Sequence, residues 1–448
     1  MIEKNPKTNT KTKQNIKELK KLTIQLDNLD NSDIKPKNYK EQKSKIEEQI
    51  HDIEVNLSQQ NQKFQEQLDL QKISYQDIST QLKSNQLYID FVRGVNNYYI
   101  FTLDNRDNIS FEQIDSNLTK SIDSNITEFL EINREIAENI NNHKLIESLK
   151  PKTNRVLLNL YTSLIGQNIK EKKASELIIS PDGKLNFLPF EALFNGKKYL
   201  LEDCTISYIS SGREFIRQSK RKNNDTDSSK VVIFGTPNYE YGLEDKAKGG
   251  LITSLSNIDD FEPIDSSKEI EIIERYYKNV EVYKGANATI ENLMSITNPK
   301  ILHISTHGFF FNDENITNPM RRSALALTSA NDAMFQNNLK GIATALKLSS
   351  MELYGTELVV LSACETALGT AYDAEGVLGL PKAFIQAGAK KVIMSLWSVS
   401  EKGTALLMEK FYTHVHQGES YPLALRDAKL EMIKRHPYYW SAFIMSGI

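Results

Sequence analysis

The chain has 448 residues, a formal net charge of −3 and two cysteines. The length suits roughly two to three domains with sizeable cores, and the charge gives no basic face for direct binding of nucleic acid. Two cysteines exclude a disulfide framework and favour a reducing compartment. Since no signal segment or run of about 20 apolar residues is found, we expect a soluble cytoplasmic protein without membrane attachment.

Residues 1–85 are rich in Lys, Gln, Asn, Glu and Asp and contain no glycine. Apolar side chains recur at helical spacing over residues 16–26 and again over 46–64, on either side of a break at 31–38. This pattern predicts two amphipathic helices folded as a hairpin. A solvated arm without a specific partner is the alternative, and the hairpin is also what a remnant of a helical repeat array would look like.

Residues 86–222 are predicted to form an α/β domain. Alternating runs predict strands at LYIDFV, NYYIFTL and ISFEQI, and helical stretches follow at 116–149 and 153–169. In ELIISPDGKLNFLPFEAL, a Pro-Asp-Gly turn separates two strand-like runs. This region offers no catalytic pattern, because His143 is the only histidine that it contains as a candidate base for a Cys204 nucleophile. We therefore expect Cys204 to be a small core residue.

A polar run at residues 220–229 is a candidate linker, and strands and helices alternate beyond it to the end of the chain. Alternation of this kind predicts a mostly parallel sheet that is covered by helices on both faces. We therefore expect a further α/β domain over residues 230–448.

Two predicted strands of this last region end on residues that suit nucleophilic catalysis. The apolar run of KILHISTHG ends at His307, which is followed by Gly308, and the run of ELVVLSACET ends at Cys364. His307 precedes Cys364 by 57 positions. This spacing is close to that of caspase-type proteases, in which the histidine precedes the cysteine by roughly 50 positions. An imidazole activates a thiol, and the Gly308 N–H is free to face an oxyanion. A plain buried cysteine is the alternative.

Other histidines of this region are expected to be structural or exposed. His303 and His307 form an H-x-x-x-H pattern, which on a helix would suit a metal. Their neighbours predict a strand, in which positions four apart lie roughly 13 Å from each other. We therefore expect no metal here, with His303 packed in the interior. No P-loop or dinucleotide-binding glycine pattern is present, and a Cys–His mechanism needs no organic cofactor. His414 and His416 fall on a polar helix and are expected to be solvated.

Three acidic residues that follow the predicted strand ends are candidates for a substrate pocket: Asp373, Glu375 and Glu401. A carboxylate at this position would bind an Arg or Lys of the substrate beside the scissile bond. For each of them, stabilisation of a helix N-terminus is the alternative.

Four ordered segments closely resemble the CHAT domain, a family of caspase- and separase-like peptidases of clan CD found mostly in bacteria: ILHISTHG, ELVVLSACETALG, DAEGVLGLPKAFIQAGAKKVIMSLWSV and HPYYWSAFIMSG. The resemblance covers residues 230–448, and SPDGKLNFLPFEAL extends it more weakly to residue 86. It implies a caspase-like catalytic domain preceded by a catalytically empty caspase-like domain, often with tetratricopeptide (TPR) repeats before that. It also implies that His307 is the catalytic histidine and Cys364 the nucleophile.

Two departures from the relatives bear on specificity. The cysteine lies in SACET and not in a QACRG-like string, so aspartate specificity has no support. In separase-like relatives, the strand after the site is similar to LWDV and is followed by another aspartate. This chain has Ser398 and Glu401 there instead. With Glu401 as the acidic pocket residue, the expected preference is for Arg or Lys before the cut.

The sequence therefore predicts a cysteine endopeptidase that cleaves a protein substrate through an acyl-enzyme. Residues 309–322 contain three Phe in a predicted loop, which suggests an enzyme that stays latent until a protein partner binds the N-terminal hairpin. A non-catalytic adaptor with a caspase-like fold is the alternative from another class. A transpeptidase or ligase would use the same dyad.

Overall fold

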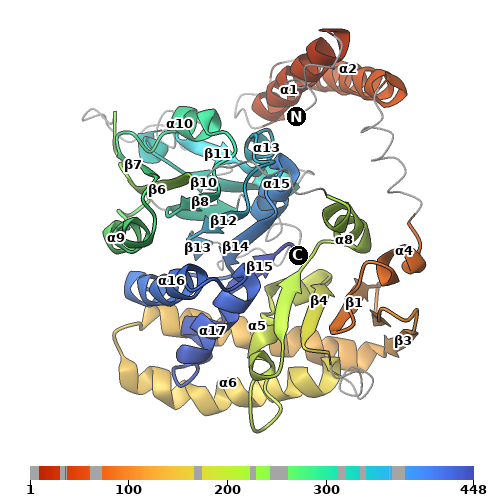
Figure 1. Cartoon of the computed structure of the whole chain (residues 1–448), viewed down its shortest axis with the longest axis vertical. Helices are drawn as coiled ribbons and strands as arrows, with labels where there is room; N and C mark the ends of the chain where they lie inside the picture. Colours follow the sequence, from red (N-terminus) through yellow and green to blue (C-terminus); the bar gives the residue numbers. More distant parts are fainter. Residues whose placement is uncertain are drawn as a thin grey trace.

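One large β-sheet runs through both predicted α/β regions (Figure 1). The computed structural model describes residues 10–30, 36, 38–60, 73–165, 174–221, 229–242, 261–310, 319–332, 340–362, 364–365 and 379–448. The eleven strands of this sheet lie in the order β3 (Ile109–Ile114), β2 (Tyr98–Leu103), β1 (Gln86–Arg93), β4 (Glu176–Ser180), β5 (Thr205–Tyr208), β15 (Phe443–Ser446), β14 (Lys391–Ser395), β12 (Leu358–Leu361), β8 (Ile301–Ile304), β6 (Val231–Pro237) and β7 (Val280–Gly285).

Parallel pairing dominates the large sheet. Only β2 with its two neighbours, and β15 with β14, pair antiparallel in the described sheet. The central strands β8 and β12 read ILHI and LVVL and are buried at every position. Fully buried strands of this kind, which are apolar apart from His303, are typical of parallel strands that are covered on both faces. The predicted α/β fold, with a mostly parallel sheet flanked by helices, is confirmed.

Groups of helices flank the sheet. One group contains α9 (Ser267–Tyr276), α16 (Glu401–His416) and α17 (Tyr421–Glu431), in which α16 contacts both of the others, and another contains α13 (Ala345–Leu348) and α15 (Gly379–Ala387). The long helices α5 (Ser116–Glu138) and α6 (His143–Leu164) run side by side (Figure 1). Besides the N-terminal helices, the described helices include α4 (Tyr75–Ser79), α8 (Gly212–Ser219), α10 (Ile290–Ser295), α11 (Pro319–Arg322) and α18 (Pro437–Trp440), with 3₁₀ turns η2 (Gly183–Phe187), η3 (Phe190–Ala192) and η4 (Leu200–Glu202).

A small second sheet adjoins the large one. Its strands lie in the order β11 (Ile342–Thr344), β10 (Ser323–Ala326), β9 (His307–Phe310) and β13 (Cys364–Glu365). Along the chain, β9 follows β8 and β13 follows β12. The two central parallel strands of the large sheet therefore continue as neighbouring strands of the small one.

The sequence patterns misplaced one helix boundary. The predicted break near Pro151 is wrong, because Pro151 lies inside α6. The chain turns instead at residues 139–142, where the Asn142 side chain accepts a hydrogen bond from the N–H of Leu145 and caps α6. A helix N-cap specifies a start more directly than a proline specifies an end.

The prediction of a second strand after the Pro-Asp-Gly turn is also wrong. Residues 183–187 form the 3₁₀ turn η2, in which Leu185 is buried and Gly183 has φ +58°. The Asp182 carboxylate accepts a hydrogen bond from the N–H of Gly183 at 2.8 Å. This left-handed glycine and its local carboxylate contact favour a tight turn over a second strand.

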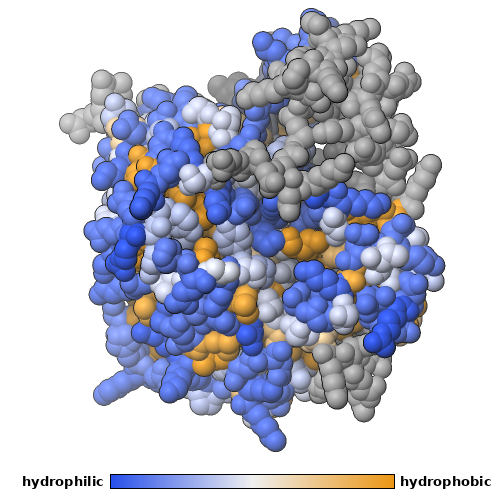
Figure 2. Space-filling model, viewed as in Figure 1, coloured by the Kyte–Doolittle hydropathy of each residue, from blue (hydrophilic) through white to orange (hydrophobic). Residues whose placement is uncertain are grey.

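The predicted N-terminal hairpin is confirmed. Helices α1 (Thr10–Asp30) and α2 (Tyr39–Gln60) contact each other and lie together at the top of the view (Figure 1). None of the helices that the structure describes is long and apolar enough to cross a bilayer. The face in Figure 2 is largely hydrophilic with small hydrophobic patches, because most large apolar side chains pack between sheet and helices.

Candidate functional site

The strand register brings His307 and Cys364 opposite each other. Parallel strands β8 and β12 are paired with Ile304 opposite Leu361. Three residues further along each chain, the first residues of β9 and β13 are again paired, with His307 opposite Cys364. Because the two strands keep a constant register as they cross between the sheets, the two residues occupy matching positions at one edge of the large sheet.

Aromatic rings enclose the His307 imidazole. The ring of Phe261 stacks on it with 5.6 Å between centroids, and the ring of Tyr239 lies 5.4 Å away. Asn331 fixes Phe261 in place, because its amide oxygen accepts from the Phe261 N–H at 2.9 Å and its amide nitrogen donates to the Phe261 carbonyl at 3.1 Å. The imidazole therefore has a defined plane.

A backbone carbonyl fixes the tautomer of His307. Nε2 lies 2.8 Å from the carbonyl oxygen of Glu262, which accepts only, so Nε2 carries the proton. Nδ1 is then the basic nitrogen, and it is buried without a hydrogen-bond partner in the described part of the chain. Burial lowers the pKa of His307, and the carbonyl and carboxylate of Glu262 oppose this effect. The neutral form, which can accept a proton at Nδ1, is favoured at neutral pH.

A buried polar network supports the end of β8. The hydroxyl of Ser305, two residues before His307, donates to Glu269 at 3.1 Å and bonds to the hydroxyl of Ser266 at 2.9 Å. The other Glu269 oxygen lies 3.0 Å from Nε2 of His303, whose Nδ1 lies 3.0 Å from the Tyr412 hydroxyl. The interior position expected for His303 is confirmed, and the network joins β8 to α9 and α16.

Gly308, the predicted oxyanion residue, lies in β9 between two paired strands. It is opposite Leu325 of β10 on one side and Glu365 of β13 on the other. Its role stays a prediction.

Of the three residues of the predicted acidic pocket, the structure describes Glu401. Asp373 and Glu375 lie outside the described residues, as do residues 311–318 of the predicted loop. Glu401 begins α16, and its carboxylate accepts a hydrogen bond from the N–H of Asp265 at 3.1 Å. Since Glu262 contacts His307, the short segment 261–266 connects Glu401 to the imidazole.

Sequence reasoning missed Tyr239, Phe261, Glu262 and Asn331. Tyr239 follows β6, Phe261 and Glu262 precede α9, and Asn331 lies between β10 and β11. No sequence motif around these residues points to the site. Only the packing of the folded chain brings them to His307, so a single sequence carries no signal for them.

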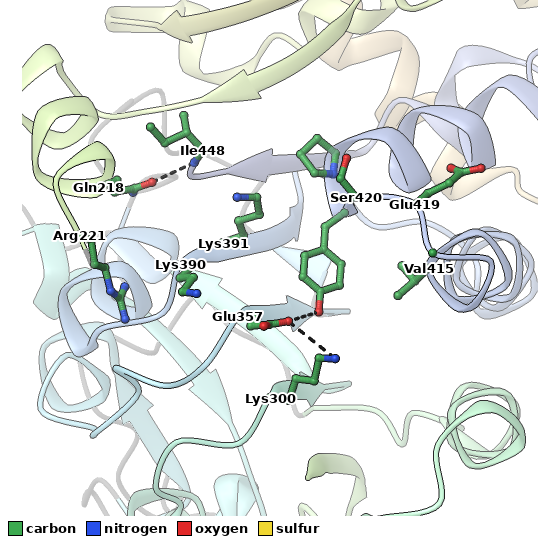
Figure 3. A pocket seen from close by; sticks show the side chains of 13 residues that line it. Gln218, Arg221, Lys300, Glu357, Lys390, Lys391, Val415, Glu419, Ser420 and Ile448 are labelled. Carbon is green, nitrogen blue, oxygen red and sulfur yellow. Dashed lines mark hydrogen bonds and ion pairs between the residues drawn. The ribbon is translucent and has the colours of Figure 1, made fainter. Parts of the chain in front are cut away.

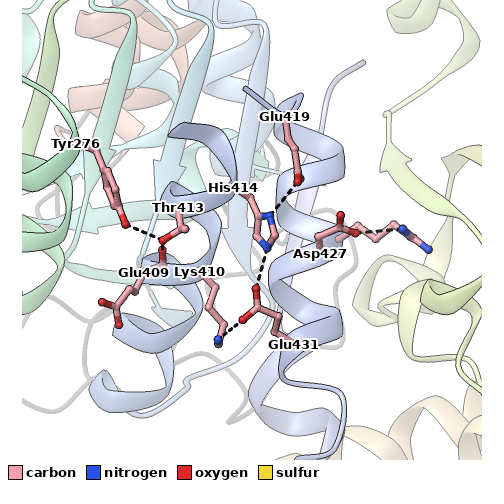
Figure 4. A network of polar contacts seen from close by, with 9 residues as sticks. Tyr276, Glu409, Lys410, Thr413, His414, Glu419, Asp427 and Glu431 are labelled. Carbon is pink, nitrogen blue, oxygen red and sulfur yellow. Dashed lines mark hydrogen bonds and ion pairs between the residues drawn. The ribbon is translucent and has the colours of Figure 1, made fainter. Parts of the chain in front are cut away.

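One group of side chains has the composition of a metal site among the described residues. The candidate ligand atoms of His414, Glu419 and Asp427 lie within 4.8 Å of one another, near the end of α16 that is opposite Glu401. Both His414 nitrogens lie 2.9 Å from carboxylates, Nδ1 from Glu419 and Nε2 from Glu431 (Figure 4). These carboxylates raise the pKa of His414 against the effect of its partial burial. A protonated imidazole cannot bind a metal, so we interpret the group as an ion cluster.

The solvated position expected for His414 is wrong, because α17 and the connection before it cover the imidazole with carboxylates. His416 is exposed, as expected, with its ring 5.0 Å from the ring of Tyr276. Cys204 is buried, as expected, and burial raises the pKa of its thiol to about 12.

Comparisons with known proteins point to one family. The family model for the CHAT domain matches residues 154–448. Tetratricopeptide repeat protein 28 of Mus musculus is 25% identical over 309 residues, and the match covers 61% of this chain and 12% of that protein. The protein of the same name from Homo sapiens matches with the same values. The chain therefore spans about an eighth of the length of these relatives.

Solved structures with a similar shape include two crystal structures of the Saccharomyces cerevisiae separase-securin complex. The first has a TM-score of 0.49 and 12% identity, and the match covers 95% of this chain and 33% of that chain. The second has a TM-score of 0.47 and 12% identity, with 93% and 32% covered.

Proposed function

Because the matching family model covers more than half of its sequence, the chain belongs to the CHAT domain family, and we propose that it is a caspase- and separase-like cysteine endopeptidase. In this proposal, His307 and Cys364 form the catalytic dyad and the substrate is a protein. The observation that carries the proposal is the parallel register of β9 and β13, which sets His307 opposite Cys364.

The environment of His307 supports a role as general base. Nε2 donates to the Glu262 carbonyl, so Nδ1 is left to take a proton. The Cys364 thiol loses its proton to Nδ1, and the thiolate attacks the substrate carbonyl to form a tetrahedral oxyanion. The backbone N–H groups of Gly308 and Cys364 are proposed to hold that oxyanion. His307 then protonates the leaving amine, and water hydrolyses the acyl-enzyme.

We propose that acidic residues select an Arg or Lys before the cut. Glu401 supports this idea because segment 261–266 joins it to His307, and its carboxylate accepts a hydrogen bond from the Asp265 N–H. Asp373 and Glu375 are proposed to complete the pocket. A guanidinium pairs well with carboxylates in a fork geometry.

We also propose that a regulatory protein partner binds the hairpin of α1 and α2. The hairpin carries partly exposed apolar side chains, among them Ile24, which is 39% exposed. Removing residues 1–72 tests this idea, and unchanged peptidase activity together with unchanged partner dependence would remove it.

Covalent labelling tests the dyad. The full-length protein is incubated with a peptidyl-Arg acyloxymethyl ketone, from which the Cys364 thiolate displaces the carboxylate to leave a thioether. Intact-mass spectrometry is expected to show one adduct in the wild type, none in Cys364→Ala and a strongly slowed reaction in His307→Ala. Replacing Arg by Ala in the probe is expected to slow labelling more in the wild type than in Glu401→Gln.

Cys204→Ala is the matched control. Its thiol is buried and its pKa is raised to about 12, so loss of this cysteine is expected to leave labelling unchanged. An adduct that persists in Cys364→Ala would contradict the proposed nucleophile. If the wild type forms no adduct and cleaves no protein even with a bound partner, the adaptor function replaces the peptidase.

A further inference from the structure

A basic cleft lies at the edge of the large sheet opposite the dyad. Its volume is about 510 Å³, and residues at the amino ends of three strands line it: Lys300 before β8, Glu357 before β12 and Lys391 at the start of β14 (Figure 3). The end of α8, with Gln218 and the following Arg221, and the start of α17 complete the wall. A volume of this size suits a small molecule.

Positive charge exceeds negative charge around this cleft. Four cationic side chains line it, Arg221, Lys300, Lys390 and Lys391, against the carboxylates of Glu357 and Glu419. Figure 3 shows the four cations around one space. The chain as a whole has a formal charge of −3, so this concentration of lysine and arginine is local.

Both carboxylates are already engaged. Glu357 accepts a hydrogen bond from the Tyr421 hydroxyl at 2.8 Å and lies 4.0 Å from the Lys300 amine. One oxygen of Glu419 pairs with the imidazole of His414 at 2.9 Å within the ion cluster (Figure 4), and its other oxygen is buried without a hydrogen-bond partner among the described residues. Neither carboxylate is therefore a dedicated counter-ion for Lys391.

Lys391 carries the least compensated charge. Its amine makes no hydrogen bond or ion pair within the described part of the chain, and the residue is partly buried at the start of β14. Burial, Lys390 and Lys83 lower the pKa of Lys391 to about 8, with Glu357 opposing them. A cation held in this way interacts strongly with an anion that enters the cleft.

A helix N-terminus faces the same space. Helix α17 has no acidic residue in its first turn, and its N-cap Ser420 makes no capping hydrogen bond with its side chain. Ser420, Tyr421 and Pro422 line the cleft. The positive end of the helix dipole favours an anion there.

We propose that this cleft binds a small ligand with two or more linked phosphate groups. Four cations and an uncapped helix start match the charge and the hydrogen-bond acceptors of a polyphosphate better than those of a single carboxylate. The cleft and the dyad lie at opposite ends of β8 and β12, so the ligand does not occupy the position of a peptide substrate.

Calorimetric titration of the full-length protein with tripolyphosphate, ATP and orthophosphate tests the proposal. Tripolyphosphate is expected to bind with one site per chain and orthophosphate much more weakly. Losing one charge-assisted contact costs about tenfold in affinity, so Lys391→Gln and Lys300→Gln are each expected to raise Kd by about tenfold. Lys391→Arg is expected to retain binding. Tighter binding of ATP than of tripolyphosphate would identify a nucleotide, and equal binding a bare polyphosphate.

Lys144→Gln on the exposed side of α6 is the control, since it removes the same charge at a residue that does not line the cleft. Thermal unfolding of every variant without ligand verifies folding. The proposal is overturned if tripolyphosphate gives no saturable heat, if orthophosphate binds equally well, or if Lys144→Gln weakens binding as much as Lys391→Gln does.

Discussion

Three histidines of this chain have pKa values that their surroundings set in different directions. Burial lowers the pKa of His307 and lowers that of His436 to about 4, whereas two carboxylates raise the pKa of His414. The folded protein therefore favours the neutral form of His307 and of His436, and it favours the charged form of His414. Each of them contributes its own pH dependence to the free energy of unfolding.

His436 gives a prediction for acidic pH. It is fully buried, accepts from the Tyr438 N–H at 3.1 Å and lies 3.0 Å from the Thr153 hydroxyl. Because its folded pKa of about 4 is below the ordinary 6.5, the unfolded chain takes up the proton first as the pH falls. The free energy of unfolding is expected to fall by about 3 kcal/mol between pH 6.5 and 4 through this group.

Urea unfolding at several pH values measures this effect. His436→Asn removes the titration and keeps an oxygen that can accept from Tyr438. The difference in unfolding free energy between wild type and variant is expected to shrink from pH 7 to pH 4. A difference that does not depend on pH would contradict a neutral buried His436.

At the scale of elements, the His414 cluster joins the end of α16 to α17. His414 belongs to α16 and Glu431 to α17, with Glu419 in the connection. Since the folded pKa of His414 is raised, its stabilising effect is complete below the unfolded pKa of about 6.5 and is lost as the pH rises through the folded pKa. This sign is opposite to that of His436.

Amide hydrogen exchange tests the His414 cluster. In His414→Gln, amides of α17 are expected to exchange faster than in the wild type at pH 6, with a smaller difference at pH 9. Lys402→Gln at the exposed start of α16 is a suitable control, because it changes the same helix without touching the cluster. Equal exchange in wild type and His414→Gln at pH 6 would show that the cluster does not hold α17.

The elements that carry His307 and Cys364 were predictable, because their signals are local. The buried runs ILHI and LVVL specify β8 and β12, and His307 and Cys364 follow at the same distance after them, as the first residues of β9 and β13. The supporting contacts were not predictable, because Phe261 and Asn331 meet His307 only through tertiary packing. Likewise, the polar pattern of α16 predicted an exposed His414, but Glu431 of α17 contacts its imidazole in the folded chain.

At the scale of the whole molecule, a buried ion pair joins the two predicted α/β regions. Lys429 of α17 lies 2.9 Å from Glu191 of η3, and their side chains are 1% and 3% exposed. The hydroxyl of Tyr208 donates to the other Glu191 oxygen. The pair lies beside the junction of β5 with β15, where Tyr208 is opposite Ser446.

Breaking this pair is expected to be costly. Lys429→Met leaves the Glu191 carboxylate buried without its cation, which typically destabilises a protein by about 3–5 kcal/mol. The double variant with Glu191→Gln is expected to recover part of the loss. Equilibrium unfolding measured by tryptophan fluorescence gives both values, and a loss below about 1 kcal/mol, the usual range for an exposed pair, would contradict the inferred burial.

The position of β15 has a consequence for synthesis on the ribosome. This strand spans residues 443–446, yet it lies between β5 and β14 in the middle of the large sheet. While the nascent chain still lacks it, β5 and β14 each have an unpaired edge, and such edges invite pairing with other chains. The two halves of the sheet can join through β15 only after this strand has been translated, so until then the edges of β5 and β14 stay open to pairing with other chains.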